Sequence, residues 1–279
     1  MVLAEDSPNR STVGAAYPVV SLLTELGLWG QLLYKYGAPT VLGLVTWSPK
    51  PCVISSRSVK NKADSKSTDR LEFERDLWSR EFTLVAGVDE AGRGPLAGPV
   101  VAAAVILPVD WGNGSFDARL VDLNDSKQLT EAQRENFFQI ITTHPDLRYA
   151  IAIVDAATID RINILQATHR AMNEALAQLQ PQPQHVLVDG RPVKTMIQPQ
   201  TALVKGDSRS YSIAAASVLA KVTRDRMMLA FDAKFPGYGF AAHKGYGVPQ
   251  HLTAIEKLGP CPIHRMSFAP LKQKQTELL

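Results

Sequence analysis

The sequence predicts an α/β fold, in which helices flank a sheet. Short runs of Val, Ile, Leu and Ala alternate along the chain with longer segments whose apolar residues recur at helical spacing. Three of the short runs end in acidic residues near glycine, as strands do at a polar edge of a sheet. A chain of 279 residues can hold one large domain, or one domain with an appendage.

The first part of the predicted domain contains three strands and two helices. The first strand begins near Leu84 and ends at the acidic pair Asp89 and Glu90. The elements that follow are, in order, a strand over 99–107, a helix from the capping box of 130–133 to about 142, a strand over 148–154 and a helix over 158–179. Pro181 and Pro183 end the last helix, because proline cannot continue one.

The second part begins with two more apolar runs that lead to acidic residues. Residues 185–188 precede Asp189 and Gly190, and residues 201–206 precede Asp207. An alanine-rich helix is predicted over about 210–230, a loop over 235–239 and a short helix over 251–258. The C-terminal portion is therefore expected to be helical.

The composition changes near residue 80. Residues 55–80 are charged and Ser-rich, which predicts a solvated linker or a frayed helix. Residues 17–47 are apolar in parts, but they lack the roughly 20 uninterrupted apolar residues of a membrane span. We expect residues 1–80 to be an N-terminal extension and linker, and residues 81–279 to be the main domain. An amphipathic attachment, a targeting segment, an extension without catalytic role and a misassigned start codon all stay open for residues 1–80.

Cysteines and charge set the broad class of the protein. The two cysteines, Cys52 and Cys261, cannot build a disulfide framework, so a reducing cytoplasm is expected. The net charge of +3 predicts only weak nonspecific attraction to nucleic acid. Several basic residues of the C-terminal third could follow phosphates: Lys205, Arg209, Lys221, Arg224, Lys244, His264 and Arg265. Solvated surface charge is the alternative for each, and Lys221 and Arg224 are expected to face solvent together.

The acidic pair and the turn after it indicate phosphodiester chemistry. Asp89 and Glu90 stand before a turn that contains Gly92 and Gly94, and carboxylates there are expected to be solvated, hydrogen-bonded or bound to metal. Oxygen ligands of this kind suit Mg²⁺ or Mn²⁺. Arg93, between the two glycines, could hold a phosphate with two hydrogen bonds. A polar strand end followed by a solvated arginine is the alternative.

Two nucleotide-binding loops are excluded at this turn. Gly87 and Gly92 have the spacing of a phosphate-binding loop, but Arg93-Gly94 stands where Lys-Ser or Lys-Thr is required. The glycines at 92, 94 and 98 also fail the dinucleotide-binding spacing, because one residue too many separates the last two.

Asp189 and Asp207 could complete a metal site with the first acidic pair. Functional crevices of α/β sheets lie outside the carboxyl ends of strands, where all three acidic positions are expected. Taken singly, Asp189 could be a turn residue and Asp207 a helix cap. Because all three acidic positions are expected at the carboxyl ends of strands, the sequence favours one metal site.

Six blocks of sequence stand out, in this order: 87–95 (GVDEAGRGP), 124–129 (NDSKQL), 188–190 (VDG), 205–208 (KGDS), 212–225 (SIAAASVLAKVTRD) and 243–247 (HKGYG). Together they resemble the bacterial ribonuclease HII family, the type 2 ribonucleases H. Residues 264–268 (HRMSF) fit as well. The resemblance covers residues 81 to 270 and depends on no single block.

The resemblance implies a ribonuclease H-like mixed sheet flanked by helices, and hydrolysis of RNA strands paired with DNA. It also implies incision at single ribonucleotides embedded in duplex DNA. Its metal-binding carboxylates correspond to Asp89, Glu90, Asp189 and Asp207. Its substrate-binding residues correspond to Gly92, Arg93, Gly94, Lys127 and Tyr246, with the tyrosine sensing the junction from RNA to DNA.

The chemistry expected of such a site is hydrolysis with two divalent ions, Mn²⁺ or Mg²⁺, which gives 5′-phosphate and 3′-hydroxyl ends. His243 and His264 are interpreted as phosphate contacts or structural hydrogen-bond donors rather than catalytic groups. A hybrid-binding protein without activity and a generic two-metal nuclease of the same fold are the alternatives. We expect a monomer that does not bind membranes. Binding to a sliding clamp stays open, because the tail 273–279 lacks an aromatic anchor.

Overall fold

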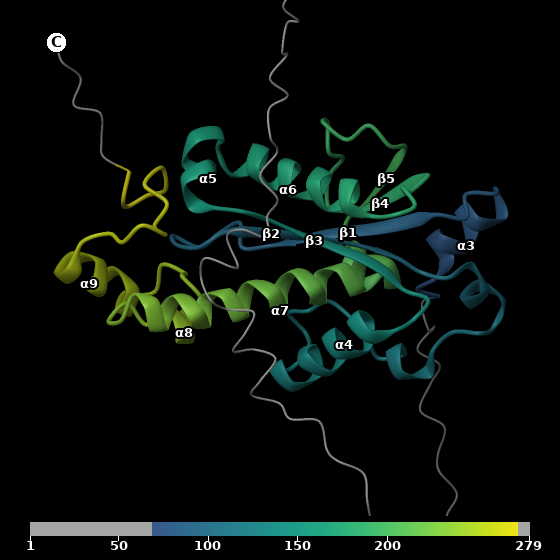
Figure 1. Cartoon of the computed structure of the whole chain (residues 1–279), viewed down its shortest axis with the longest axis horizontal. Helices are drawn as coiled ribbons and strands as arrows, with labels where there is room; N and C mark the ends of the chain where they lie inside the picture. Colours follow the sequence, from purple (N-terminus) through teal and green to yellow (C-terminus); the bar gives the residue numbers. More distant parts are fainter. Residues whose placement is uncertain (1–68, 273–279) are drawn as a thin grey trace, which may run out of the picture. The chain divides into compact units, whose positions relative to one another are not determined.

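The structure is a computed structural model that describes residues 69–272 (Figure 1). The predictions for residues 17–47, for Cys52 and for the tail 273–279 lie outside the described residues. Within residues 69–272, no helix combines the length and the apolar character that a bilayer crossing requires.

A mixed sheet of five strands forms the centre of the described part, as predicted. The strands are β1 (Val85–Ala91), β2 (Val100–Ile106), β3 (Arg148–Val154), β4 (His185–Asp189) and β5 (Gln200–Leu203). Their order across the sheet is β3-β2-β1-β4-β5. β2 is antiparallel to both of its neighbours, β1 and β3. β4 is parallel to both of its neighbours, β1 and β5. The first strand in the sequence therefore lies in the middle of the sheet.

Helices cover both faces of this sheet (Figure 1). α5 (Ala156–Ile162) and α6 (Ile164–Gln178) lie on one face, and α4 (Glu131–Thr143) and α7 (Tyr211–Lys234) lie on the other. The short helices α8 (Phe240–His243) and α9 (Pro249–Leu258) follow α7 and make the C-terminal portion helical, as predicted. The capping box predicted at Thr130 is present and begins α4.

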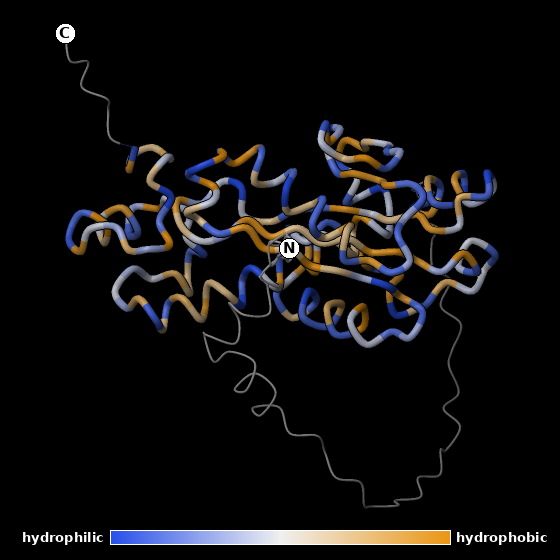
Figure 2. The backbone as a smooth tube through the Cα atoms, turned by 45° about the horizontal axis from the view of Figure 1, so that its top comes forward, coloured by the Kyte–Doolittle hydropathy of each residue, from blue (hydrophilic) through white to orange (hydrophobic). Residues whose placement is uncertain are grey.

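Side chains along each strand point alternately to the two faces of the sheet, and this divides the core into two layers. In β1, Ala86 and Val88 belong to the layer under α6. The residues between and after them, Gly87 and Asp89, point to the opposite face because successive side chains of a strand alternate. A Cβ added at Gly87 would lie 2.4 Å from the backbone nitrogen of Ile213, so the start of α7 contacts β1 directly. Figure 2 shows hydrophobic residues along the central strands.

The prediction of one continuous helix over 158–179 is wrong. The segment is two helices that meet at Asn163, whose φ of 65° a continuous helix does not permit. The side chain of Asn163 accepts a hydrogen bond from the backbone N–H of Gln166 and so caps α6. A local capping residue inside an otherwise helical pattern explains the break.

The last part of the segment 55–80, predicted as a solvated linker or a frayed helix, is helical but not solvated. Residues 72–79 form helix α3, and Leu71 and Leu77 are buried against the core. Glu74 is fully buried and accepts hydrogen bonds from Ser210 and Ser212 at the start of α7. The folded unit therefore begins before residue 80, because the apolar residues of this charged segment pack on the core.

Candidate active site

The register of the sheet brings Asp89 and Asp189 together. Val88 on β1 is paired with Val188 on the parallel strand β4, so the next residue of each strand lies beside the other on the face toward α7. Asp89 is buried, and its Oδ1 accepts a hydrogen bond of 2.7 Å from the backbone N–H of Glu90. The strand pairing itself thus creates a pair of adjacent carboxylates.

Asp207 reaches the same place from the segment between β5 and α7. It lies in a short 3-10 helix, η3 (Gly206–Ser208), and is buried. The backbone N–H of Gly206 donates a hydrogen bond of 2.7 Å to Asp189 Oδ1 and ties this segment to β4. A Cβ at Gly206 would lie 2.6 Å from Ile213 Cδ1, so this segment packs closely against the start of α7.

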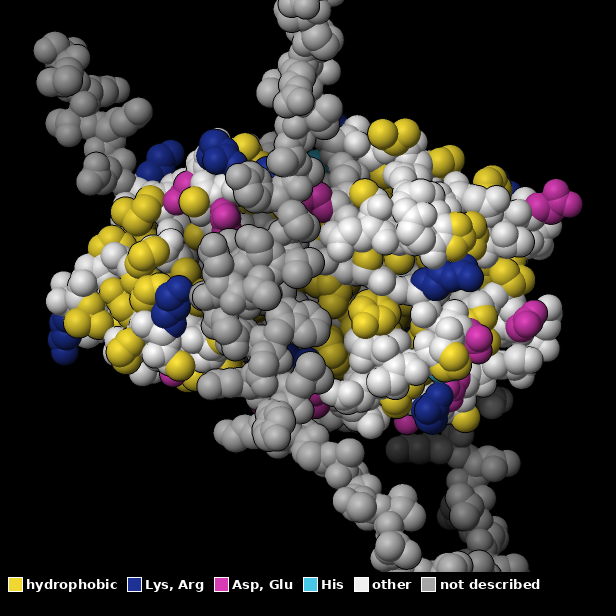
Figure 3. Space-filling view, viewed as in Figure 1, with side chains coloured by type: hydrophobic (Ala, Val, Ile, Leu, Met, Phe, Trp, Pro, Cys, Tyr) yellow, Lys and Arg dark blue, Asp and Glu magenta, His cyan; other side chains and the backbone are white. Residues whose placement is uncertain are grey.

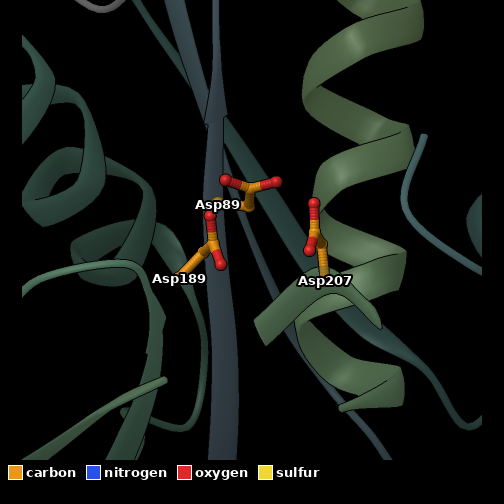
Figure 4. Close-up of side chains that lie close together, drawn as sticks. All are labelled: Asp89, Asp189 and Asp207. Carbon is orange, nitrogen blue, oxygen red and sulfur yellow. The ribbon is translucent and has the colours of Figure 1, made fainter. Parts of the chain in front are cut away.

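The carboxylates of Asp89, Asp189 and Asp207 converge. One oxygen from each lies within 4.8 Å of the others, and the three side chains point toward a common space (Figure 4). They come from two neighbouring strands and from η3, which agrees with the expectation that these acidic residues share one place. Sequence reasoning thus identified all three members of the cluster.

The cluster is electrostatically suited to a divalent cation. Burial, followed by the neighbouring charges of Glu90 and Asp189, raises the pKa of Asp89 well above its ordinary value. Burial and the charge of Asp189 raise the pKa of Asp207 to about 6. A cation would relieve this repulsion, and three hard carboxylate ligands are the donor set that Mg²⁺ and Mn²⁺ take in proteins.

Glu90 lies next to this cluster but is not one of its three members. Its Oε1 accepts a hydrogen bond of 3.0 Å from Arg93 Nη1, which forms an ion pair across the turn. Burial raises the pKa of Glu90, while Arg93 opposes the shift. Its assignment as a fourth metal ligand stays a prediction.

The turn with Gly92, Arg93 and Gly94 lies against the loop that carries Tyr246. A Cβ added at Gly94 would lie 3.6 Å from Cε1 of Tyr246, and the tyrosine is 48% exposed. Arg93 and Gly94 are also exposed. The turn and the tyrosine ring therefore form one accessible surface.

Lys127 lies close enough to the carboxylate cluster for the charges of all three aspartates to act on its amine. Burial lowers the pKa of its amine, but the charges of Asp125, Asp89, Asp207 and Asp189 raise it more, and the net shift is upward. Asp125 also contributes to the raised pKa of Asp207. Sequence reasoning did not single out Asp125, whose only signal was its place in the block 124–129.

Sequence reasoning also did not identify Arg70, which lies just before α3. Its guanidinium donates to the backbone carbonyl of Leu123, to Asn124 Oδ1 at 3.4 Å and to the backbone carbonyl of Asp207 at 3.1 Å. It therefore joins the segment before Lys127 to the segment that carries Asp207. No local pattern marks such a residue, because its partners are distant in sequence.

The predicted phosphate-following set of basic residues needs correction. Arg224, His264 and Arg265 are buried, so they cannot follow phosphates, and Arg224 does not face solvent beside Lys221. Lys221 forms an ion pair of 2.7 Å with Asp225. Figure 3 shows separated Lys and Arg side chains on the face in view.

His243 and His264 have structural hydrogen bonds. His264 Nδ1 accepts from the backbone N–H of Cys261 at 2.8 Å, and burial lowers the pKa of His264 to about 4. His243 Nδ1 accepts from the backbone N–H of Gly245 at 3.2 Å. Neither ring belongs to the carboxylate cluster, in agreement with the interpretation that they are not catalytic.

Comparisons with known proteins agree with the fold. The family model described as Ribonuclease HII matches residues 86–271. The chain is 54% identical over 214 residues to a ribonuclease HII of Ruminiclostridium cellulolyticum, an alignment that covers 75% of this chain and 80% of the relative.

Solved structures of archaeal relatives are similar as well. The ribonuclease H2 of Pyrococcus horikoshii aligns with a TM-score of 0.57 and 29% identity, over 67% of this chain and 94% of that one. The ribonuclease HII of Archaeoglobus fulgidus, solved as a complex with PCNA, aligns with a TM-score of 0.55 and 26% identity, over 69% and 98%. With most of the described residues matched by the family model, the chain belongs to the ribonuclease HII family.

Proposed function

We propose that this protein is an endonuclease that hydrolyses the RNA strand of RNA/DNA hybrids and incises duplex DNA at single embedded ribonucleotides. The products would carry 5′-phosphate and 3′-hydroxyl ends. The convergence of Asp89, Asp189 and Asp207 in a chain of this family is the observation that carries the proposal.

Asp89, Asp189 and Asp207, together with Glu90, would hold the divalent ions. When bound, Mg²⁺ or Mn²⁺ supplies the activation of a water and the neutralisation of charge on the leaving oxygen. The protein contributes fixed ligand positions, because two of the aspartates are part of paired strands and the third is tied to β4 through Gly206. Such preorganisation avoids rearrangement when the substrate binds.

Substrate recognition would use the exposed side of the site. Arg93, which is paired with Glu90, and Lys127, on which the charges of the three aspartates act, would contact phosphates next to the carboxylate cluster. The backbone N–H groups of the turn at Gly92, Arg93 and Gly94 could bind the ribose 2′-hydroxyl, the group that separates RNA from DNA at one nucleotide. The half-exposed ring of Tyr246 could stack on the sugar of the following deoxynucleotide.

A comparison of three duplexes tests this function. The purified full chain is incubated with an RNA/DNA hybrid, a DNA duplex that carries one ribonucleotide, and a plain DNA duplex, each with Mg²⁺, Mn²⁺ or chelator. We expect cleavage of the first two with metal, and almost none by Asp189→Asn, because a neutral amide cannot replace the carboxylate ligand. Cleavage of plain DNA would favour the generic nuclease, and binding without cleavage would favour the inactive hybrid-binding protein.

Tyr246→Ala tests the recognition of the junction. Loss of a stacking contact costs about 1–3 kcal/mol, which is roughly 5- to 150-fold in rate if the contact acts in the transition state. We expect that loss on the single ribonucleotide and a smaller loss on the continuous hybrid, with Tyr246→Phe as the control that keeps the ring. An unchanged ratio of kcat/KM on the two substrates would make Tyr246 a structural residue of its loop.

One copy of the chain would be sufficient for this activity. The three aspartates of the cluster and Tyr246 all come from the same chain. We therefore propose a monomer, and light scattering during size-exclusion chromatography would measure its mass. Addition of a sliding clamp to the same measurement would test the partner that the sequence left open.

A further inference from the structure

Two arginines are buried near the turn of Gly92–Gly94 without an acidic partner. Arg224, on α7, is 1% exposed, and Arg265, after α9, is 0% exposed. Among residues 69–272, neither guanidinium forms an ion pair; the ion pairs in that range involve other cations. Burial of a cation without a counterion is costly, so other groups must satisfy these donors.

Backbone carbonyls on both sides of the turn satisfy them. Arg265 donates from Nε to Gly98 at 2.9 Å, from Nη1 to Arg93 at 3.0 Å, and from Nη2 to Gly92 at 2.5 Å and to Pro99 at 3.1 Å. Arg224 donates from Nε to Pro99 and from Nη2 to Ala97, both at 3.0 Å. Arg265 therefore connects the turn at 92–93 with residues 98–99, which lead into β2. Arg224 holds residues 97 and 99 of the same segment.

These hydrogen bonds determine which way the N–H groups of the turn point. A trans peptide is planar, so its N–H is directed opposite to its C=O. Since the carbonyls of Gly92 and Arg93 point inward to Arg265, the N–H groups of Arg93 and Gly94 point outward. Both residues are exposed, and neither N–H donates a hydrogen bond to another group in residues 69–272.

Two glycines permit the close approach of Arg224. A Cβ at Gly92 would lie 2.1 Å from Arg224 Nε and 2.4 Å from its Cδ, and one at Gly98 would lie 3.3 Å from Nη2. Both glycines have positive φ, 96° and 88°. The backbone on both sides of the turn is thus built to contact a guanidinium.

The arginines remain charged at neutral pH. Burial, and for Arg265 also the charge of Arg224, lowers the pKa of Arg265 to about 9 and that of Arg224 to about 10. Two positive charges therefore lie behind the turn, where they increase the polarity of its outward N–H groups.

We propose that Arg224 and Arg265 are positioning residues that orient the N–H groups of Arg93 and Gly94 toward the ribose 2′-hydroxyl. This inference rests on the proposed function, since it concerns how that site distinguishes RNA from DNA. Arginine is required because its planar fork can reach several carbonyls at once. Lysine would keep the charge but not this geometry.

The test compares two duplexes that differ only in one 2′-hydroxyl. Affinity for each is measured by fluorescence anisotropy with the full chain in Ca²⁺, and the duplex is checked for integrity afterwards. The variants are Arg265→Lys and Arg224→Lys. Arg226→Lys is the matched control, because Arg226 lies on the same helix but forms an ion pair with Glu135.

We expect the wild type and Arg226→Lys to prefer the ribonucleotide duplex equally. Arg265→Lys should lose most of this preference, up to about tenfold, which is the effect of one or two hydrogen bonds. Its affinity for plain DNA should change by less than about twofold, because the phosphate contacts remain. Arg224→Lys, which removes fewer carbonyl contacts, should lose less.

Three results separate the possibilities. Folded Arg265→Lys and Arg224→Lys with the wild-type preference would overturn the inference and leave the proposed function intact. A wild type without any preference would overturn both. If Arg265→Lys does not fold in a thermal-unfolding control, Arg224→Lys, which loses only two of the six hydrogen bonds, tests the inference alone: a wild-type preference would overturn it, and a reduced preference would support it.

Discussion

Substitution of Glu74 would test how α3 supports the site. Its Oε1 accepts hydrogen bonds from Ser210 Oγ at 2.6 Å and from the backbone N–H and Oγ of Ser212 at 3.0 and 2.7 Å. The other oxygen, Oε2, is buried without a partner in the described residues. Glu74 therefore caps the start of α7, whose N-cap Ser210 lies three residues after Asp207.

The expected loss of stability follows from these contacts. Glu74→Ala leaves three buried donors without their acceptor, and each unsatisfied donor costs about 1–3 kcal/mol. The hydroxyls of Ser210 and Ser212 lie 3.0 Å apart and can partly satisfy each other. We therefore expect Glu74→Ala to lower the free energy of unfolding by about 2–4 kcal/mol.

Glu74→Gln should behave differently and should depend on pH. Glutamine keeps one oxygen as acceptor and removes the buried charge. Burial raises the pKa of Glu74 above its ordinary value of 4.5, although the three donors oppose the shift. A carboxyl with a raised pKa contributes stability below pH 4.5 and loses it as the pH rises through the raised value. Relative to the wild type, Glu74→Gln should therefore become more stable between pH 4.5 and 7.

Urea unfolding with chelator present would measure all three proteins at pH 5 and pH 7. The titration of the other carboxyls affects all three proteins equally, so it cancels in the difference between their free energies of unfolding. The chelator removes stabilisation by bound metal. If Glu74→Gln is as unstable as Glu74→Ala at pH 7, the negative charge is required and the reasoning is refuted.

Three further predictions concern the carboxylate cluster, the packing of α7 and the start of the folded unit. Mn²⁺ affinity, measured by calorimetry, should fall below about pH 6, because burial and Asp189 raise the pKa of Asp207 to about 6 and ligands must be deprotonated; a constant affinity from pH 5 to 8 would contradict this. Gly87→Ala should lower the free energy of unfolding by about 1–3 kcal/mol or more, since its Cβ would overlap the start of α7, and a urea midpoint equal to the wild type would refute this contact. A chain that begins at Ala63 should keep the wild-type urea midpoint and one that begins at Glu81 should not, because α3 packs on the core; equal midpoints would return α3 to the linker.

The sheet and the three aspartates were predictable because their signals are local. A run of five to seven residues that is wholly apolar, or in which apolar and polar residues alternate, predicts a strand, and an acidic residue followed by glycine predicts its end. The parallel register of β1 and β4 then places Asp89 beside Asp189 without further information. Thr130 was equally local, since a capping box spans four residues.

The buried charged residues were not predictable. Glu74, Arg224 and Arg265 have sequence surroundings typical of solvated helices or loops. Their burial depends on acceptors and donors that tertiary packing brings from 125 to 173 positions away. The charged segment around α3 was therefore interpreted as a solvated linker or a frayed helix, and the two arginines as surface residues.

The central position of β1 has a consequence for the dynamics of the site. Its backbone is hydrogen-bonded to β2 on one side and β4 on the other, and α6 and α7 cover its two faces. Amides of central, doubly paired strands are expected to be among the last of a domain to exchange with solvent. Asp89 directly follows the doubly paired residues 85–88 and is itself paired with Ala103 of β2, so the entropy of ordering this residue is lost during folding. Neither a metal ion nor a nucleic acid has to compensate for it when it binds.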